Sequence, residues 1–238
     1  MNKMQKMKDV LETKLVPITD KITNNRYVKI LMDGFMGISA LTIGASFFTL
    51  IRSLPLGDGY TQFLQSTGLY DILNFPILIT SELISLYLIL AIGYFTAKSF
   101  DKKPINRALI ALGSYLMLTP FETTAIVTTQ SGEQISSIVS NVLQVSSFGS
   151  MGIFLAMIVG IISVRIYVWF DEKGIKLKMP ASVPENVTNM FETMIPASMI
   201  FIIFMFIRVG CSYTSYGTAQ DLIYGILQAP LTHIGGGY

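Results

Sequence analysis

Two glutamates of this 238-residue chain stand where a carboxylate could do chemistry in an apolar setting. Glu82 lies inside the apolar run Phe75–Ala97, and Glu122 follows Pro120 at the end of a second run. An ionisable group in lipid costs about 3 kcal/mol or more, so it normally faces a partner, a cavity or a substrate path. Glu82 could line such a path, or it could be a structural carboxylate bonded to hydroxyl groups or reaching outward. Glu122 could line an outer vestibule or be an exposed loop acid.

The other reactive side chains do not assemble into a catalytic or metal site. The chain has one cysteine, Cys211, and one histidine, His233. This count excludes an intrachain disulfide, a Cys/His metal cage and a Ser-His-Asp triad. Gly235–Gly237 is preceded by no strand and followed by no helix, so it is no phosphate-binding loop. We therefore expect no metal and no cofactor, and the sequence alone leaves open whether the chain takes part in an enzymatic reaction.

The elements that must position these residues are membrane spans. The chain is 51% hydrophobic and only 13% charged, with a mean hydropathy of +0.56, whereas soluble domains carry about 25% charged residues. The run Ile30–Ile51 has 22 residues and one charge, Asp33. As a helix it would be about 33 Å long, enough to cross the hydrocarbon core. Asp33, near Arg26 and Lys29, is interpreted as a structural acid at the start of this helix.

The sequence predicts five spans in an all-α integral membrane protein. The third is short, so either Ile105–Arg107 extends it, with Arg107 reaching the interface, or the bilayer thins there. A bend is expected at Pro196 in the fifth. The predicted spans are Ile30–Ile51, Phe75–Ala97, Ala108–Pro120, Phe148–Phe170 and Ile195–Val209.

The segments outside the spans are predicted to be mostly amphipathic. Residues 1–29 form a basic amphipathic segment, residues 30–212 the membrane domain, and residues 213–238 an amphipathic tail. Within 121–147, an extended stretch is expected before a semi-polar helix around Glu133–Gln144, which could be interfacial or re-entrant. Ser182 and Glu185 have the spacing of a capping box that would begin a second amphipathic helix.

Lysine and arginine alternate along the chain in a way that predicts its orientation. Seven precede the first span, and the following segments hold one, four, none, four and one, which together account for all 17. Basic residues favour cytoplasmic loops, so the N-terminus is predicted to be cytoplasmic and the C-terminal end outside. The clusters do not form the basic, aromatic-lined face that nucleic acid would need.

Two stripes of small residues predict tight helix packing in the membrane. Small side chains let helix backbones approach closely where lipid gives no hydrophobic drive for association. A dedicated dimer face and ordinary packing within one chain both remain open for them. The stripes are Gly37, Ala40 and Gly44 in the first span, and Gly149, Gly152, Ala156 and Gly160 in the fourth.

Three stretches resemble the membrane component, enzyme IIC, of bacterial phosphoenolpyruvate-dependent sugar phosphotransferase systems, in the lactose/cellobiose class. The likeness follows family order along nearly the whole chain, and 108–120 agrees more weakly. The stretches are DGFMGISALTIGASFFTLIRSLP (33–55), FGSMGIFLAMIVGIISVRIYVWF (148–170), and VPENVTNMFETMIPASMIFIIFMFIR with QDLIYGILQAPLTHIGG (183–208 and 220–236).

The resemblance implies a homodimeric permease of the bacterial cytoplasmic membrane. Such a permease binds an extracellular disaccharide or β-glucoside and delivers it to a phosphorylated cytoplasmic sugar-specific subunit. The family's sugar-binding histidine and Asn-Glu motif lie beyond the QAP-containing helix, and Tyr238 comes before them. His233 does not match the context of that histidine, so no sugar-binding residue is assigned.

This departure predicts that the chain is the scaffold half of such a permease. It could be a truncated product, or one half of a split permease with a separate C-terminal half. The alternative is a non-transporting membrane scaffold or interaction protein derived from one.

Overall fold

The computed structural model describes residues 23–128, 134–177, 179–180 and 182–226. Residues 1–22 of the amphipathic segment predicted over 1–29 lie outside this part, as do His233 and the glycine run, and the last residues of that segment already belong to α3. The described chain is mostly helical, and one hairpin of two strands interrupts the helices. Its labelled helices are α3 (Arg26–Arg52), α4 (Asp58–Ser66), α5 (Leu69–Glu82), α6 (Ile84–Ser99), α7 (Pro104–Leu118), α8 (Ile153–Glu172) and α9 (Glu185–Ser212).

The first predicted span is α3, and Asn25 is its N-cap residue. The side chain of Asn25 accepts hydrogen bonds from the backbone N–H groups of Tyr27 (2.9 Å) and Val28 (3.4 Å). This satisfies two of the donors that every helix start leaves unpaired. The helix then continues for 27 residues, about 40 Å at 1.5 Å per residue, so it is long enough to cross a bilayer.

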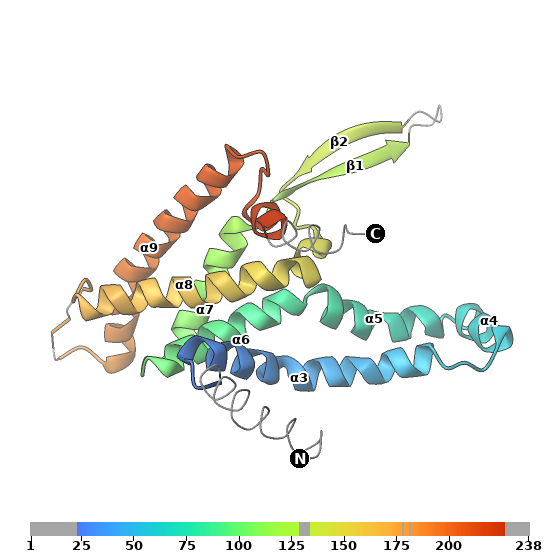
Figure 1. The fold of residues 1–238 in the computed structure, drawn as a ribbon, viewed down its shortest axis with the longest axis horizontal. Coiled ribbons are helices and arrows are strands. Elements are labelled where there is room, and N and C mark those ends of the chain that lie inside the picture. Colours follow the sequence, from blue (N-terminus) through green and yellow to red (C-terminus); the bar gives the residue numbers. More distant parts are fainter. Residues whose placement is uncertain (1–22, 129–133, 178, 181, 227–238) are drawn as a thin grey trace, which may run out of the picture.

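The second predicted span is broken, which corrects the prediction of one helix over 75–97. Its two parts, α5 and α6, meet at Leu83 with a bend of 44°. The predicted loop over 52–74 also contains α4 and the first turns of α5. Figure 1 shows that α4, α5 and the end of α3 form an arm that extends past the other helices. No residue of α5 is buried, so the arm exposes its apolar side chains to its surroundings.

The segment after α7 is a β-hairpin, not the helix predicted around 133–144. Strand β1 (Glu122–Thr128) pairs antiparallel with β2 (Gln134–Ser140), and Glu122 lies opposite Ser140. Two short 3₁₀ turns, η2 (Val145–Phe148) and η3 (Ser150–Gly152), then lead directly into α8. The hairpin projects away from the helical bundle (Figure 1). Its extended pairing rules out a re-entrant helix at 134–140.

Helix α9 joins two elements that are predicted to be separate, the second amphipathic helix and the fifth span. It runs without interruption from Glu185 through Pro196 to Ser212, so the amphipathic segment and the fifth span are one helix. The predicted capping box is wrong, because Pro184 is the N-cap residue and no side-chain hydrogen bond caps the helix. A last helix begins at 219 and continues to 226, the limit of the described residues.

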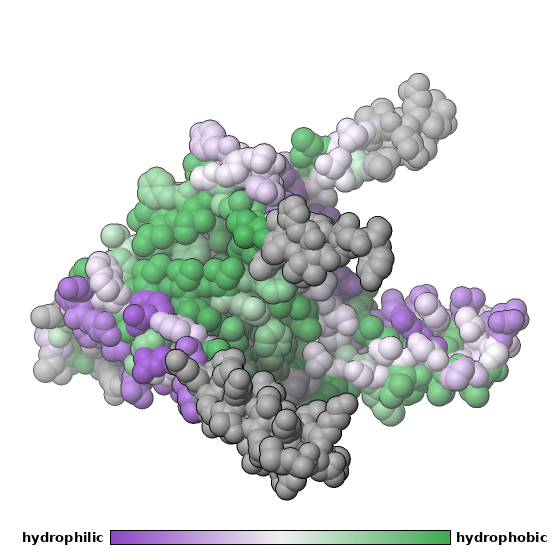
Figure 2. Space-filling model, viewed as in Figure 1, coloured by the Kyte–Doolittle hydropathy of each residue, from purple (hydrophilic) through white to green (hydrophobic). Residues whose placement is uncertain are grey.

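Helix α6 lies at the centre of the bundle and packs against α3, α7 and α8. The larger buried cluster joins α6, α7, α8 and α9, and a smaller one joins α3 to α6 around Leu88 and Ile92. Outside these clusters, Figure 2 shows a broad hydrophobic face over α8 and α9. An apolar surface of this extent is suited to lipid rather than to water.

In the described residues, three helices are long and apolar enough to cross a membrane, and the bent α5–α6 pair makes a fourth candidate. Helix α7 has 15 residues, about 22 Å, which is less than the hydrocarbon core. It begins at Pro104, so the extension through Ile105–Arg107 is present. These lengths and hydropathies define a multi-pass membrane protein.

Candidate functional site

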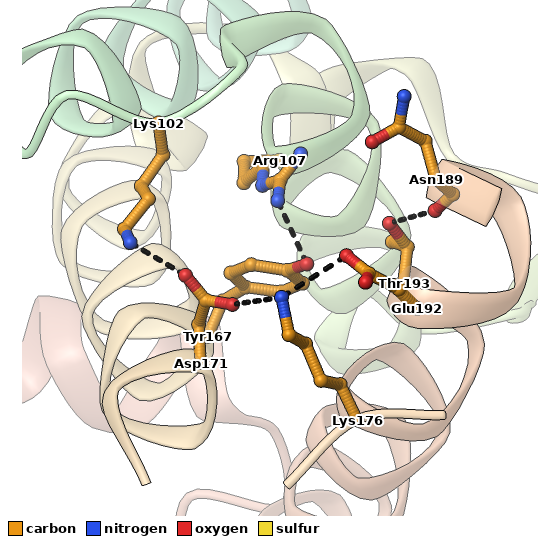
Figure 3. Close-up of polar contacts among 8 residues, drawn as sticks. All are labelled: Lys102, Arg107, Tyr167, Asp171, Lys176, Asn189, Glu192 and Thr193. Carbon is orange, nitrogen blue, oxygen red and sulfur yellow. Dashed lines mark hydrogen bonds and ion pairs between the residues drawn. The ribbon is translucent and has the colours of Figure 1, made fainter. Parts of the chain in front are cut away.

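The first candidate site is a cluster of charges at the end of the bundle where α7 begins and α8 ends. Asp171 binds Lys102 through one carboxylate oxygen and Lys176 through the other, the latter at 3.6 Å. Lys176 also binds Glu192 at 3.1 Å, so Figure 3 shows four side chains of alternating charge in a row. All four are less than a third exposed. The row connects the start of α7, the end of α8 and the first turns of α9.

Arg107 provides a second connection between α7 and α8. Its Nη2 donates a hydrogen bond of 2.8 Å to the hydroxyl of Tyr167, and its guanidinium lies 4.3 Å from the centre of that ring. Figure 3 shows the two side chains facing one another. Arg107 is 9% exposed and its Nε has no hydrogen-bond partner. The side chain therefore turns inward to Tyr167. This corrects the sequence interpretation in which Arg107 reaches the membrane interface.

The cluster holds helix ends together and is not suited to catalysis. The hydrogen bond to Glu192 raises the pKa of the Lys176 amine above its ordinary value, and the charge of Asp171 acts in the same direction. The Lys176 amine therefore stays charged at neutral pH. The described part of the chain holds no group of three His, Cys, Asp or Glu side chains that could bind a metal. What the arrangement can do is fix the loop after α8 against α7.

The contacts across the helix ends also test one part of the predicted topology. Arg26 at the start of α3 and Arg165 near the end of α8 both lie against the ring of Phe100, with 4.4 and 4.6 Å between guanidinium carbon and ring centre. Lys102 meets Asp171 at the same end. The three basic segments that the topology assigns to one side therefore lie together. That this side is cytoplasmic stays a prediction.

A second candidate site is a network of buried hydroxyl groups at the opposite end of α6. The Ser85 hydroxyl donates to the Phe148 carbonyl at 2.6 Å and lies 2.7 Å from the Tyr115 hydroxyl. The Tyr115 hydroxyl also lies 3.3 Å from the Ser147 carbonyl, to which the Gln220 amide donates at 3.0 Å. The network fixes the 3₁₀ turns against α6, α7 and the last described helix.

Gly152 lies in the middle of this hydroxyl network. A Cβ atom there would be 2.5 Å from the Ser147 carbonyl oxygen and 2.6 Å from the Ser85 hydroxyl, and still closer to the Tyr115 hydroxyl. Gly160, two turns further along α8, would bring a Cβ within 2.7 Å of Ile92. Real Cβ atoms essentially never approach this closely, so these two positions admit only glycine without rearrangement.

The other small residues of the predicted stripes have varied surroundings. Ala156 is fully buried between Gly152 and Gly160. A Cβ at Gly37 would lie 3.2 Å from Phe95, and one at Gly149 would lie 3.5 Å from the Glu82 carboxylate. Gly44 has no neighbouring atom within 4 Å, and Ala40 is exposed.

Gly34, Gly93 and Gly113 lie in tight contacts that the sequence did not predict. A Cβ at Gly34 would be 2.7 Å from Ile92, one at Gly93 would be 3.0 Å from Ala108, and one at Gly113 would be 2.8 Å from Phe201. For Gly34 a signal exists, because it falls on the four-residue spacing of the buried positions Ile30 and Ile38. The predicted stripe at 37, 40 and 44 lies further around the same helix.

The two candidate glutamates do not come together. Glu82 is the last residue of α5, exposed at the bend, and does not lie within an uninterrupted span. Glu122 is the exposed first residue of β1. It lines two surface hollows of about 430 and 130 Å³ beside Pro120 and Thr218. The structure therefore places each acid at the end of an element, with its side chain exposed on the surface of the fold.

The residues at the other predicted positions have structural surroundings. Trp169, in α8, is 50% exposed and stacks edge-on against Phe170, as an interfacial aromatic would. Cys211 is a buried free thiol near the end of α9. Asp33 lies beside Arg26 and Lys29 in a cavity at the start of α3.

A bundle of apolar helices with glycine-packed crossings and one basic end is the architecture of a multi-pass membrane protein. Residues 32–237 match the family described as "Phosphotransferase system, EIIC". This match covers most of the chain, which therefore belongs to that family. The resemblance found in the sequence is confirmed.

Individual relatives agree with this assignment. The oligo-β-mannoside-specific EIIC component of Bacillus subtilis is 33% identical over 94% of this chain and 49% of its own length. The cellobiose-specific EIIC component of Geobacillus stearothermophilus is 26% identical over 95% of this chain and 50% of its own. A lactose-specific EIICB component of Staphylococcus haemolyticus is 26% identical over 79% of the chain.

A solved structure shares the fold. It is that of the transporter ChbC, the IIC component of an N,N′-diacetylchitobiose-specific phosphotransferase system, with a TM-score of 0.85 and 28% identity. The match covers 94% of this chain and 52% of ChbC. The chain thus spans about half the length of the relatives it matches.

Proposed function

We propose that this chain forms the scaffold part of a sugar permease that works with a phosphotransferase system in the bacterial cytoplasmic membrane. The observation that carries the proposal is the match to the EIIC family: the B. subtilis relative and ChbC each align with 94% of this chain but with only about half of their own length. By its relatives' names, the transported sugar would be a disaccharide of the cellobiose or lactose class. The partner would be the phosphorylated cytoplasmic sugar-specific subunit, which some relatives carry fused as EIICB.

The packing of the described helices supports a scaffold role. Hydroxyl groups buried between α6, α7 and the 3₁₀ turns bond one another or main-chain carbonyls, so they are engaged in structure. The exposed arm adds a surface for a second copy. On it, Phe47, Leu50, Ile72 and Phe75 are each more than 60% exposed. We propose that this face contributes to a homodimer. In a single copy of the chain these side chains would contact only lipid, whereas a second copy could pack against them.

Sugar uptake in cells tests the proposal. We would express residues 1–238, alone or together with the portion of the G. stearothermophilus cellobiose-specific EIIC component that lies beyond the matched half, in a host without its own cellobiose permease. The intact G. stearothermophilus component is the positive control, and membrane insertion of each chain is checked by fractionation. We expect phosphoenolpyruvate-dependent uptake of labelled cellobiose only when both portions are present.

The outcomes separate the alternatives. Uptake by residues 1–238 alone would overturn the scaffold assignment. No uptake with both portions inserted would favour the non-transporting membrane scaffold, the second interpretation of the sequence.

A further inference from the structure

A cavity of about 410 Å³ lies between the start of α3 and the end of α6. Three of its lining side chains are cations, two are apolar, and one is an acid. These are Arg26, Lys29 and Lys98, then Ile30 and Phe95, then Asp33. The lining of the cavity therefore combines an excess of positive charge with apolar side chains.

The cations of this cavity outnumber its one acid. Arg26, Lys29 and Lys98 line it with Asp33, and within the described part of the chain no ion pair joins any of these cations to an acid. Arg165 adds a further positive charge, because it shares the ring of Phe100 with Arg26. This excess of positive charge favours an anionic ligand.

The position of the cavity points to the membrane surface. Arg26 is the first residue of α3, and the apolar run begins at Ile30, one turn later. Exposed Tyr27 and Tyr94 lie on the same two helices, and such rings collect at the level of lipid headgroups. The basic residues thus lie where the phosphates of a bilayer would be. Basic pockets between membrane helices on the cytoplasmic side are known to hold anionic headgroups.

We propose that this cavity binds the phosphate group of an anionic phospholipid. Lys29 and Lys98 face the phosphate from two different helices, and Arg26 supplies a third charge. The apolar walls, Ile30 and Phe95, accept the glycerol and the first methylene groups of the lipid. A free phosphate ion has no part that would use these walls. The bound lipid would join the start of α3 to the end of α6 at the bilayer surface.

Native mass spectrometry of the whole chain in detergent tests this site. The probes are phosphatidylglycerol, phosphatidylcholine with the same acyl chains, and inorganic phosphate. The variants are Lys29→Gln and Lys98→Gln, singly and combined. Lys173→Gln is the matched control, because Lys173 is an exposed lysine at the same end of the bundle and outside the cavity.

We expect the parent chain and Lys173→Gln to retain phosphatidylglycerol in preference to phosphatidylcholine. Each cavity substitution should weaken this binding about fivefold, the effect of one lysine near an anionic surface. Equal retention by the cavity variants and the control would overturn the proposal. So would equal retention of the two lipids, or displacement of phosphatidylglycerol by inorganic phosphate at similar concentration. None of these readouts depends on sugar transport.

Discussion

Replacing Gly152 by alanine is the sharpest single test of how the bundle is held together. Gly152 has φ −78° and ψ −14°, which alanine adopts freely. The backbone therefore gives no reason for glycine, and any effect must come from the added methyl group. That methyl group would lie 2.5 Å from the Ser147 carbonyl oxygen and 2.6 Å from the Ser85 hydroxyl.

The cost follows from what the methyl group displaces. Forcing one methylene into a packed interior costs about 1–3 kcal/mol. Ser85 and Tyr115 are fully buried, so moving them apart leaves at least one hydroxyl without its partner, at about 1–3 kcal/mol. The free energy of unfolding should fall by about 3 kcal/mol. For a chain of this size that corresponds to a melting temperature roughly 6–12 °C lower.

The assay is thermal unfolding of purified variants in detergent, followed by circular dichroism. The matched control is Gly44→Ala in α3, where no atom lies within 4 Å of the added Cβ. Alanine there should leave the melting temperature unchanged or raise it slightly, since alanine is the better helix former. Equal melting temperatures for Gly152→Ala and Gly44→Ala would refute the reasoning.

A double variant tests the cause more closely. Ser85→Ala removes one of the atoms that the new methyl group meets. The combined cost of Gly152→Ala and Ser85→Ala should therefore be smaller than the sum of the two single costs. Additive costs would mean that the methyl group acts elsewhere.

Three further predictions concern other contacts of the bundle. Gly160→Leu should separate α8 from α6, so that the protein elutes as aggregate in size-exclusion chromatography; an unchanged elution profile would contradict the close packing. Tyr167→Phe should lower the melting temperature by several degrees, because buried Arg107 loses its acceptor. Tyr213→Phe, at an exposed tyrosine, should not lower it. Similar melting temperatures for the two variants would count against the contact between Arg107 and Tyr167. Lys176 has a pKa raised above 10.5 in the folded protein, so its ion pairs stabilise the fold fully below that pH and are lost as pH rises through the raised value. The melting difference between the parent and Lys176→Gln should therefore be constant near neutrality and vanish in strong alkali, and a difference that grows with pH would have the wrong sign.

Hydropathy predicted the helices well, because a long apolar run admits few other structures in lipid. The ends of α3 at Arg52 and of α8 at Glu172 lie close to the predicted ends, Ile51 and Phe170, whereas both helices begin at other residues than predicted. Composition could not reveal the bend at Leu83, since apolar residues continue on both sides of it. Composition also did not show that the amphipathic segment and the fifth span form one helix, α9, which continues through Pro196.

The sequence predicts the first strand of the hairpin as an extended stretch, but not its pairing with a second strand, although a signal for a hairpin exists. Thr123, Thr124, Ile126, Val127 and Thr128 form a β-branched run, and Gly132 follows at a position suited to a turn. The apolar spacing in 134–140 was interpreted as helical, but short runs do not separate the two periods. Strand pairing decided the structure there.

The candidate sites were harder to predict than the elements. The lysine and arginine count indicated that the basic segments share one side, but not that Lys176 would connect Asp171 to Glu192. Partners far apart in sequence are set by tertiary packing, which a single sequence does not contain. For Glu82 the run of apolar residues suggested depth, whereas the helix break leaves the side chain exposed.

The contact of Ile92 with two glycines has a consequence for how this chain can vary. Gly34 on α3 and Gly160 on α8 both lie against Ile92, whose side chain is fully buried on α6. A larger residue at either glycine would demand a smaller one at position 92, and that change would in turn loosen the opposite contact. The three positions therefore form one volume shared among three helices, so a tolerated substitution at one of them should require compensation at both others.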